Sequence, residues 1–325
     1  MEKDRAVATR GRTKKGAGGE RGETRQEIWL LGQPPLSDYL DFVRRSVVGG
    51  GGMPQAAVVD AWRDANDHYR TLEDAEAGIA DDIDVAELPK AMVAAAKALS
   101  RSPSFRATFD RVPARFAMVE LDKIVVWQKR VTAGHVERLR AALDPRPDKA
   151  GLFRFCQPVE RRDPPVRIRR LGGQRFAFVS ESNDLRFHHC DLFREDQLPG
   201  YESFGPIAGV VGLVVGYGSN FLTAIQSDDR VILHNGYHRA VALRAAGYTH
   251  APCIIQTATR RDELDLLAAP AVVDDPAFYL RARRPPLLKD FFDPRIRTVL
   301  DVHAVERVVE VSFEVTEIGA YEVGP

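Results

Sequence analysis

The stretch from Arg230 to Gln256, which reads RVILHNGYHRAVALRAAGYTHAPCIIQ, decides the fold. It opens with a short apolar run typical of a buried strand, and an Asn-Gly pair typical of a turn follows. Residues 237–246 have the composition of a helix, which Gly247 closes. Pro252 then begins a second apolar run that indicates another strand. Strand, turn, helix and strand in this order predict an α/β protein.

The turn between the strand and the helix carries the chemistry. Gly236 has no Cβ, so its backbone can approach a ligand closely. The first N–H groups of the following helix have no partners within it and favour an anion. Arg239 lies in the first helical turn, where a guanidinium can meet a phosphate in a bidentate fashion. Asn235–Arg239 is therefore a candidate phosphate site, although many α/β folds use the same arrangement for packing alone.

Two segments in this order resemble the boxes of the ParB/sulfiredoxin-like superfamily over about residues 115–256. The second box is the Gly-x-x-Arg turn of Gly236–Arg239, with an Ala-Gly helix end and a strand begun by Pro252. The first box is Leu121–Arg130, where an Ile and a Gln-x-Arg precede a predicted helix. Tyr237 stands where sulfiredoxins place their catalytic Cys, so the resemblance does not imply sulfinic-acid reduction.

The resemblance implies an α/β (α+β) fold with a mixed sheet and a nucleotide ligand, ATP or CTP, used with Mg²⁺. It implies phosphoryl transfer or NTP hydrolysis on a small molecule, which needs positioning and charge neutralisation. The residues expected to bind the nucleotide are Gln128, Arg130, Asn235, Gly236, Tyr237, His238 and Arg239. The expected catalytic residues are His238 and an acidic group from Glu120, Asp122, Glu181 or Asp184. A nucleic-acid binding protein or nuclease, and a scaffold without catalysis, are the alternatives.

Glu181 and Asp184 belong to a polar segment directly after a predicted strand. Side chains at strand ends commonly carry ligand contacts in open α/β sheets, and a carboxylate there can hold Mg²⁺ or act as a base. The alternative is a polar loop in which Asn and Asp serve as turn residues. The strand itself belongs to a hairpin predicted at 166–179, with a glycine turn.

The rest of the chain divides by composition. Residues 1–27 are charged and nearly free of apolar side chains, which predicts a disordered tail. The composition of residues 28–112 predicts a helical accessory region. Residues 113–257 are assigned to the ParB/sulfiredoxin-like domain, with a long insertion at about 150–229. Residues 258–325 form a C-terminal extension, in which Val308–Val315 alternates polar and apolar residues like a half-buried strand. That strand is a candidate to pair across a homodimer.

Composition limits the function classes. Lys plus Arg and Asp plus Glu both number 46, so the chain as a whole has no charge that attracts nucleic acid or a membrane. No apolar run reaches the roughly 20 residues of a membrane span, and the charged N-terminus predicts no secretory signal. Cys156, Cys190 and Cys253 are few and far apart, which predicts buried free thiols and a cytoplasmic protein.

Overall fold

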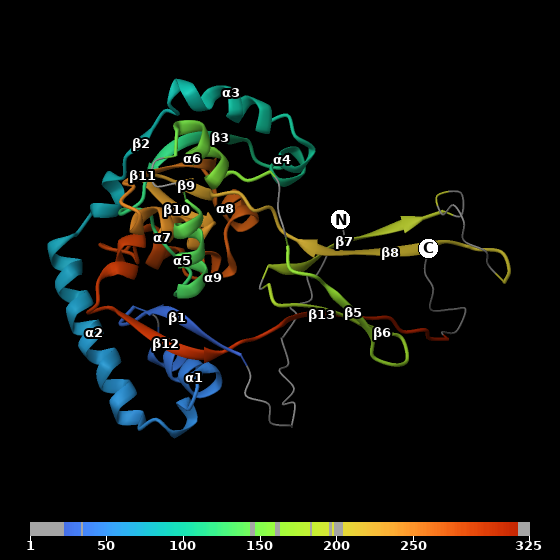
Figure 1. The fold of residues 1–325 in the computed structure, drawn as a ribbon, viewed down its shortest axis with the longest axis horizontal. Coiled ribbons are helices and arrows are strands. Elements are labelled where there is room, and N and C mark those ends of the chain that lie inside the picture. Colours follow the sequence, from blue (N-terminus) through green and yellow to red (C-terminus); the bar gives the residue numbers. More distant parts are fainter. Residues whose placement is uncertain are drawn as a thin grey trace.

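The computed structural model describes residues 23–33, 35–143, 147–159, 163–182, 184–194, 197 and 204–317. It has a body of helices and sheets from which two long β arms extend (Figure 1). The fold is mixed α/β, as the sequence predicts. No described helix combines the length and the apolar character that crossing a membrane requires.

The central sheet of the body is mixed. Its strand order is β10-β9-β11-β3-β2, and only β9 and β11 run parallel to each other. The strands are β10 (Arg230–Asn235), β9 (Thr223–Ser227), β11 (His250–Thr257), β3 (Ala114–Glu120) and β2 (Val85–Ala86). β9, β10 and β11 are largely buried, which explains their continuous apolar runs. The strand–turn–helix–strand prediction for 230–256 is confirmed.

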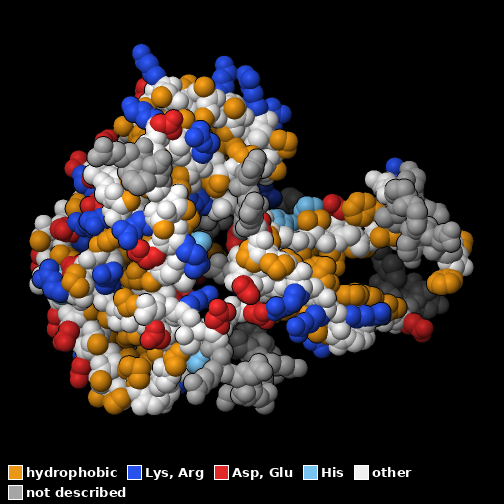
Figure 2. Space-filling model, in the orientation of Figure 1, with side chains coloured by type: hydrophobic (Ala, Val, Ile, Leu, Met, Phe, Trp, Pro, Cys, Tyr) orange, Lys and Arg blue, Asp and Glu red, His pale blue; other side chains and the backbone are white. Residues whose placement is uncertain are grey.

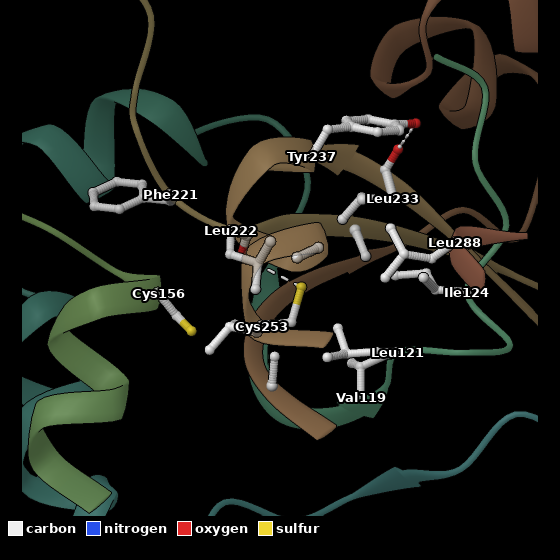
Figure 3. Packing of buried hydrophobic residues seen from close by; sticks show 14 of the residues in the cluster. Val119, Leu121, Ile124, Cys156, Phe221, Leu222, Leu233, Tyr237, Cys253 and Leu288 are labelled. Atoms are coloured by element: carbon white, nitrogen blue, oxygen red, sulfur yellow. Dashed lines mark hydrogen bonds between the residues drawn. The ribbon is translucent and has the colours of Figure 1, made fainter. Parts of the chain in front are cut away.

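Helices cover this sheet and close a large core on one side of it and a smaller one, formed with Leu264, Val272 and Tyr279, on the other. Figure 3 shows the thiols of Cys156 and Cys253 among the apolar side chains that fill the large core. The helices around the central sheet are α3 (Lys90–Leu99), α4 (Pro103–Thr108), α5 (Ala133–Ala142), α6 (Lys149–Cys156) and α7 (Tyr237–Ala245). Three further short helices follow the sheet, α8 (Arg261–Leu267), α9 (Pro270–Asp274) and α10 (Pro276–Leu280). Leu288 and Phe291, from the C-terminal extension, are fully buried in the same core.

A smaller sheet at the edge of the body corrects the predicted N-terminal boundary. Its order is β12 (Arg297–His303), β1 (Thr24–Leu30) and β4 (Arg130–Thr132), and it packs with α1 (Leu36–Ser46) and α2 (Gln55–Ala75). Residues 24–27, predicted as tail, are part of the central strand of this sheet, and residues 1–22 lie outside the described residues. The correction has a physical cause, because the polar strand start leads into the buried Trp29, Leu30 and Leu31.

The two arms are built from the predicted insertion and the C-terminal extension. One is the sheet β13-β6-β5, made of β5 (Arg167–Arg170), β6 (Arg175–Ser180) and β13 (Arg307–Ser312). The other is the hairpin of β7 (Leu185–Phe193) and β8 (Val210–Tyr217). The hairpin predicted at 166–179 is confirmed, with Gly172 and Gly173 at positive φ in its turn. The C-terminal strand that was a candidate to pair with a second copy of the chain is β13, and in the structure it pairs with β6 of its own chain.

All three cysteines are free, but only two are buried. Cys156 and Cys253 lie in the core, where burial raises the pKa of the Cys156 thiol to about 12. Cys190 is exposed on β7, so its predicted burial is wrong. A strand of an outlying arm has few neighbours to cover it, which the local sequence does not reveal.

Deleting residues 1–30 should lower the melting temperature by more than about 10 °C, because it removes a central strand and the burial of Trp29 and Leu30. Deleting residues 1–22 leaves β1 intact and should change it little. Differential scanning calorimetry measures the melting temperatures of both truncated proteins and of the full chain. Equal melting temperatures for the two would show that β1 contributes little to stability.

Candidate functional site

A large open cleft of about 1810 Å³ lies where the body meets the arms. Its walls come from β1, the start of α5, the base of β7, the loop between β8 and β9, and the turn before α7. Figure 2 shows histidine side chains at this junction. Five of the eight histidines of the chain line the cleft, namely His135, His188, His189, His234 and His238. Imidazole groups, which titrate near neutral pH, are therefore concentrated at one place.

The turn predicted as the phosphate site opens into this cleft. Gly236 has φ +91°, a conformation that residues with a Cβ rarely adopt. A Cβ at this position would lie 2.6 Å from Leu222 Cδ1 and 3.2 Å from Leu222 Cα. The close approach that demands glycine is thus to Leu222 of the protein itself. Asn235 closes the turn by donating to the carbonyls of Ser219 (2.8 Å) and Phe221 (3.1 Å).

Tyr237 is buried and ties the turn to the first box. Its hydroxyl donates to the Leu233 carbonyl at 2.8 Å, as Figure 3 shows. The same oxygen accepts from the backbone N–H groups of Trp127 (2.9 Å) and Gln128 (3.3 Å). Burial holds the pKa of this phenol far above its usual range. Tyr237 therefore has a structural task, and it places Gln128 on the cleft wall.

Arg239, the arginine of the predicted site, is 6% exposed. One guanidinium nitrogen donates to the Cys156 carbonyl at the end of α6 (2.7 Å), and another donates to the side-chain oxygen of Asn220. The guanidinium thus joins α7 to α6 and to the loop between β8 and β9. The two oxygen atoms that accept these hydrogen bonds are neutral, and the guanidinium itself carries a positive charge beside the cleft.

His238 is held as a neutral imidazole. Its Nε2 accepts from the Thr132 backbone N–H at 3.0 Å, which requires a lone pair on that nitrogen. Burial, followed by the neighbouring His135 and Arg239, lowers the pKa of His238 to about 3. The His135 ring meets the His238 ring edge-on, with centroids 4.8 Å apart. The geometry and the charge environment both favour the unprotonated form at neutral pH.

Three buried nitrogen atoms of residues that line the cleft have no hydrogen-bond partner among the described residues. They are Nε of Arg25, Nε1 of Trp127 and Nδ1 of His234. Burial, with a smaller contribution from Arg186, lowers the pKa of His234, so this ring is neutral as well. A buried polar atom without a partner is unfavourable unless a ligand or water satisfies it. The cleft therefore offers at least two places for polar contacts with a ligand.

The two acidic candidates from the polar segment also belong to the cleft lining. Glu181 and Asp184 both line the cleft, and Asp184 forms an ion pair with Arg186. This brings two of the four predicted carboxylates to the same space as the α7 turn. The described residues contain no group of three His, Cys, Asp or Glu side chains arranged for a metal ion.

Three predicted site residues lie elsewhere. Glu120 pairs with Lys123 (3.3 Å) and accepts from the Asp84 N–H, and Asp122 pairs with Arg244 at 2.9 Å. Arg130 lies over the Phe42 ring, 4.9 Å from its centroid. The prediction placed these residues near the turn because they lie in or beside the first box. They do not line the cleft, and their side chains make other contacts that box spacing alone does not specify.

The sequence did not point to the side chains of Arg25, His135 and Arg138, which line the cleft together with Asn220. Arg25 belongs to the segment assigned to the tail, and Asn220 follows a glycine-rich turn. His135 and Arg138 share one face of α5 at the three-residue spacing that brings helical side chains together, which is the one signal that could have found them.

Comparison with known proteins adds no relative: no family model, no curated protein and no solved structure matches the chain.

Replacing Gly236 by Ala should destabilise the protein by about 1–3 kcal/mol, because the positive φ and the contact with Leu222 both oppose a Cβ. Gly134→Ala is the matched control. A Cβ there meets only the end of the Arg138 side chain at 3.7 Å, so the change should be neutral or stabilising. Urea unfolding measures both. A wild-type stability for Gly236→Ala would contradict the packing constraint.

Neutral His238 predicts that the free energy of unfolding falls as the pH is lowered. An unfolded His binds its proton near pH 6.5, whereas the folded His238 does so only near 3. Between these two pH values the unfolded state binds one more proton than the folded state. The free energy of unfolding therefore falls by about 1.4 kcal/mol for each pH unit. His238 should therefore contribute a loss of about 2 kcal/mol between pH 7 and pH 5.

His238→Gln keeps an acceptor for the Thr132 N–H and removes the titrating group, so it should reduce this pH dependence by the same amount. Urea unfolding at the two pH values provides the measurement. His303→Gln, an exposed change in β12, should leave the pH dependence unchanged. If the free energy of unfolding of His238→Gln depends on pH as it does in the wild type, His238 is protonated equally in the folded and unfolded states.

Proposed function

We propose that the cleft binds a nucleotide, ATP or CTP, through its phosphates and transfers or hydrolyses the terminal phosphoryl group. One observation carries the proposal: the first turn of α7 opens into a cleft that is also lined by Arg25, Arg138 and Arg186. Free N–H groups at a helix start and nearby guanidinium groups are the donors that bind phosphate oxygens. The buried Nε of Arg25, which has no partner among the described residues, supports a ligand with acceptor atoms.

The role proposed for Arg239 follows from its contacts. Its guanidinium holds Asn220 and the end of α6 against the turn, so it positions the phosphate site. Side chains that are more exposed to the cleft than Arg239 make the direct contacts with phosphate. Arg138 and His135 are exposed there on α5, and Gln128 is held at the wall by its backbone contact with Tyr237.

Glu181 and Asp184 supply the acidic component of the proposal. An exposed carboxylate facing a phosphate site can orient an acceptor hydroxyl or water, and Glu181 is the more accessible of the two. Mg²⁺, which neutralises phosphate charge when bound, commonly takes only one or two carboxylates together with phosphate oxygens and waters. Glu181 and Asp184 fit that donor set as residue types.

Replacing Arg138 by Ala should weaken nucleotide binding by about 1.5–3 kcal/mol, the scale of a hydrogen bond to a charged group. Arg140→Ala on the same helix is the control, because Arg140 pairs with Glu137 on the exposed face and does not line the cleft. Calorimetric titration with ATP and CTP, with and without Mg²⁺, measures the affinity of both variants and the wild type.

Phosphate release in the same samples separates an enzyme from a binding protein without catalysis. If Arg138→Ala and Arg140→Ala weaken nucleotide binding equally, the nucleotide does not bind in the cleft. A wild-type protein that binds neither nucleotide, but binds DNA with a steep dependence on salt, would replace the proposal by a nucleic-acid function.

A further inference from the structure

The β7–β8 hairpin extends from the body as a thin arm (Figure 1). Among the described residues it is a sheet of two strands. At its base Leu185 is fully buried, and the Leu185 carbonyl accepts from Arg307 at 3.3 Å. Further along, most side chains of both strands are exposed. A two-stranded sheet on its own is marginally stable in water, so this arm requires additional support.

One face of the hairpin is apolar along its whole length. The register places Phe187 opposite Val215, Cys190 opposite Leu213, and Leu192 opposite Val211. Directly opposed residues share a face, so these six side chains form one apolar surface. Leu192 is 75% exposed, Val211 61% and Phe187 47%. Figure 2 shows hydrophobic side chains along this arm.

The opposite face is mixed. Arg186 and His189, on β7, line the cleft at the base of the arm, and Asp191 follows them on the same face with Val210, Val214 and Phe193. The polar side chains of the hairpin therefore lie on the face that contributes to the cleft wall. An apolar face of this extent on a two-stranded arm is typical of a surface that another chain covers.

The two outer edges of the hairpin differ in charge. β7 carries Arg186 and Asp191, whereas no charged residue occurs between Phe204 and Asn220, the segment that contains β8. The other arm has charged outer strands, with Arg167, Arg169 and Arg170 on β5 and Arg307 and Glu310 on β13. Charges on an edge strand oppose pairing with another chain. Of the outer strands of the two arms, β8 alone lacks this protection within the described chain.

We propose that β8 pairs antiparallel with β8 of a second copy of this chain, about a two-fold axis at Leu213. This register sets Leu213 against the partner's Leu213 and Val211 against the partner's Val215, so all these side chains stay on the apolar face. The two hairpins become one four-stranded sheet with a continuous apolar face, which provides the support that two strands lack.

A second copy fits this edge better than an unrelated strand. The two-fold pairing leaves only the charged β7 strands at the outer edges, so assembly stops at the dimer. The uncharged β8 offers no ionic group with which to select a different partner. The interface lies on β8, and the cleft lining of this arm is on β7, so the dimer is independent of the proposed nucleotide function.

Sedimentation velocity of the full chain should show a dimer, and Leu213→Lys should shift it to monomer because two lysines would meet at the axis. Val93→Lys, at a half-exposed position on α3, is the matched control and should remain dimeric. Circular dichroism melting establishes that both variants fold. A monomeric wild-type chain, or a folded Leu213→Lys that stays dimeric, overturns the proposal.

Cross-linking tests the register. In a Cys190→Ser background, Leu213→Cys should form a disulfide-linked dimer under mild oxidation, because position 213 meets its own copy. Leu192→Cys in the same background lies on the outer strand and should remain largely monomeric. Cross-linking at 192 equal to that at 213, or none at 213, overturns pairing through β8.

Discussion

The first turn of α7 holds together segments that are far apart in the sequence. The Tyr237 hydroxyl accepts hydrogen bonds from the N–H groups of Trp127 and Gln128. The His238 ring accepts from the N–H group of Thr132, and the Arg239 guanidinium donates to the carbonyl of Cys156. Buried backbone groups without partners are strongly unfavourable, so each contact fixes the path of a whole segment. The walls of the cleft depend on these three consecutive side chains and on the glycine that lets the chain turn before them.

This arrangement explains why motif residues have two tasks. Residues of the Gly-x-x-Arg turn hold backbone in place, and the same contacts leave the start of the helix facing the cleft. His238 illustrates the coupling, since the Thr132 N–H that fixes the β4–α5 junction also fixes the imidazole as neutral. A neutral ring beside Arg25 and Arg138 avoids adding a further positive charge to a crowded site. Rigid support of this kind keeps binding groups in a fixed geometry.

The arms add an outer wall that the body does not provide. Their bases carry Glu181, Asp184 and Arg186 to the cleft. Their outer parts have little cover of their own, and β8 leaves an uncharged edge.

The sequence alone determined the mixed α/β class, the strand–turn–helix–strand unit at 230–256 and the hairpin at 166–179, because local periodicity and turn residues specify them. It also named the α7 turn and the Glu181–Asp184 segment as candidate site residues, and both line the cleft. Only the tertiary structure decided that β1 begins at Thr24, that Glu120 and Asp122 face other partners, and that Arg25 and Arg138 join the site. The position of β1 and the partner of Asp122 depend on contacts with segments more than a hundred residues away, and no local pattern specifies which group a side chain will meet.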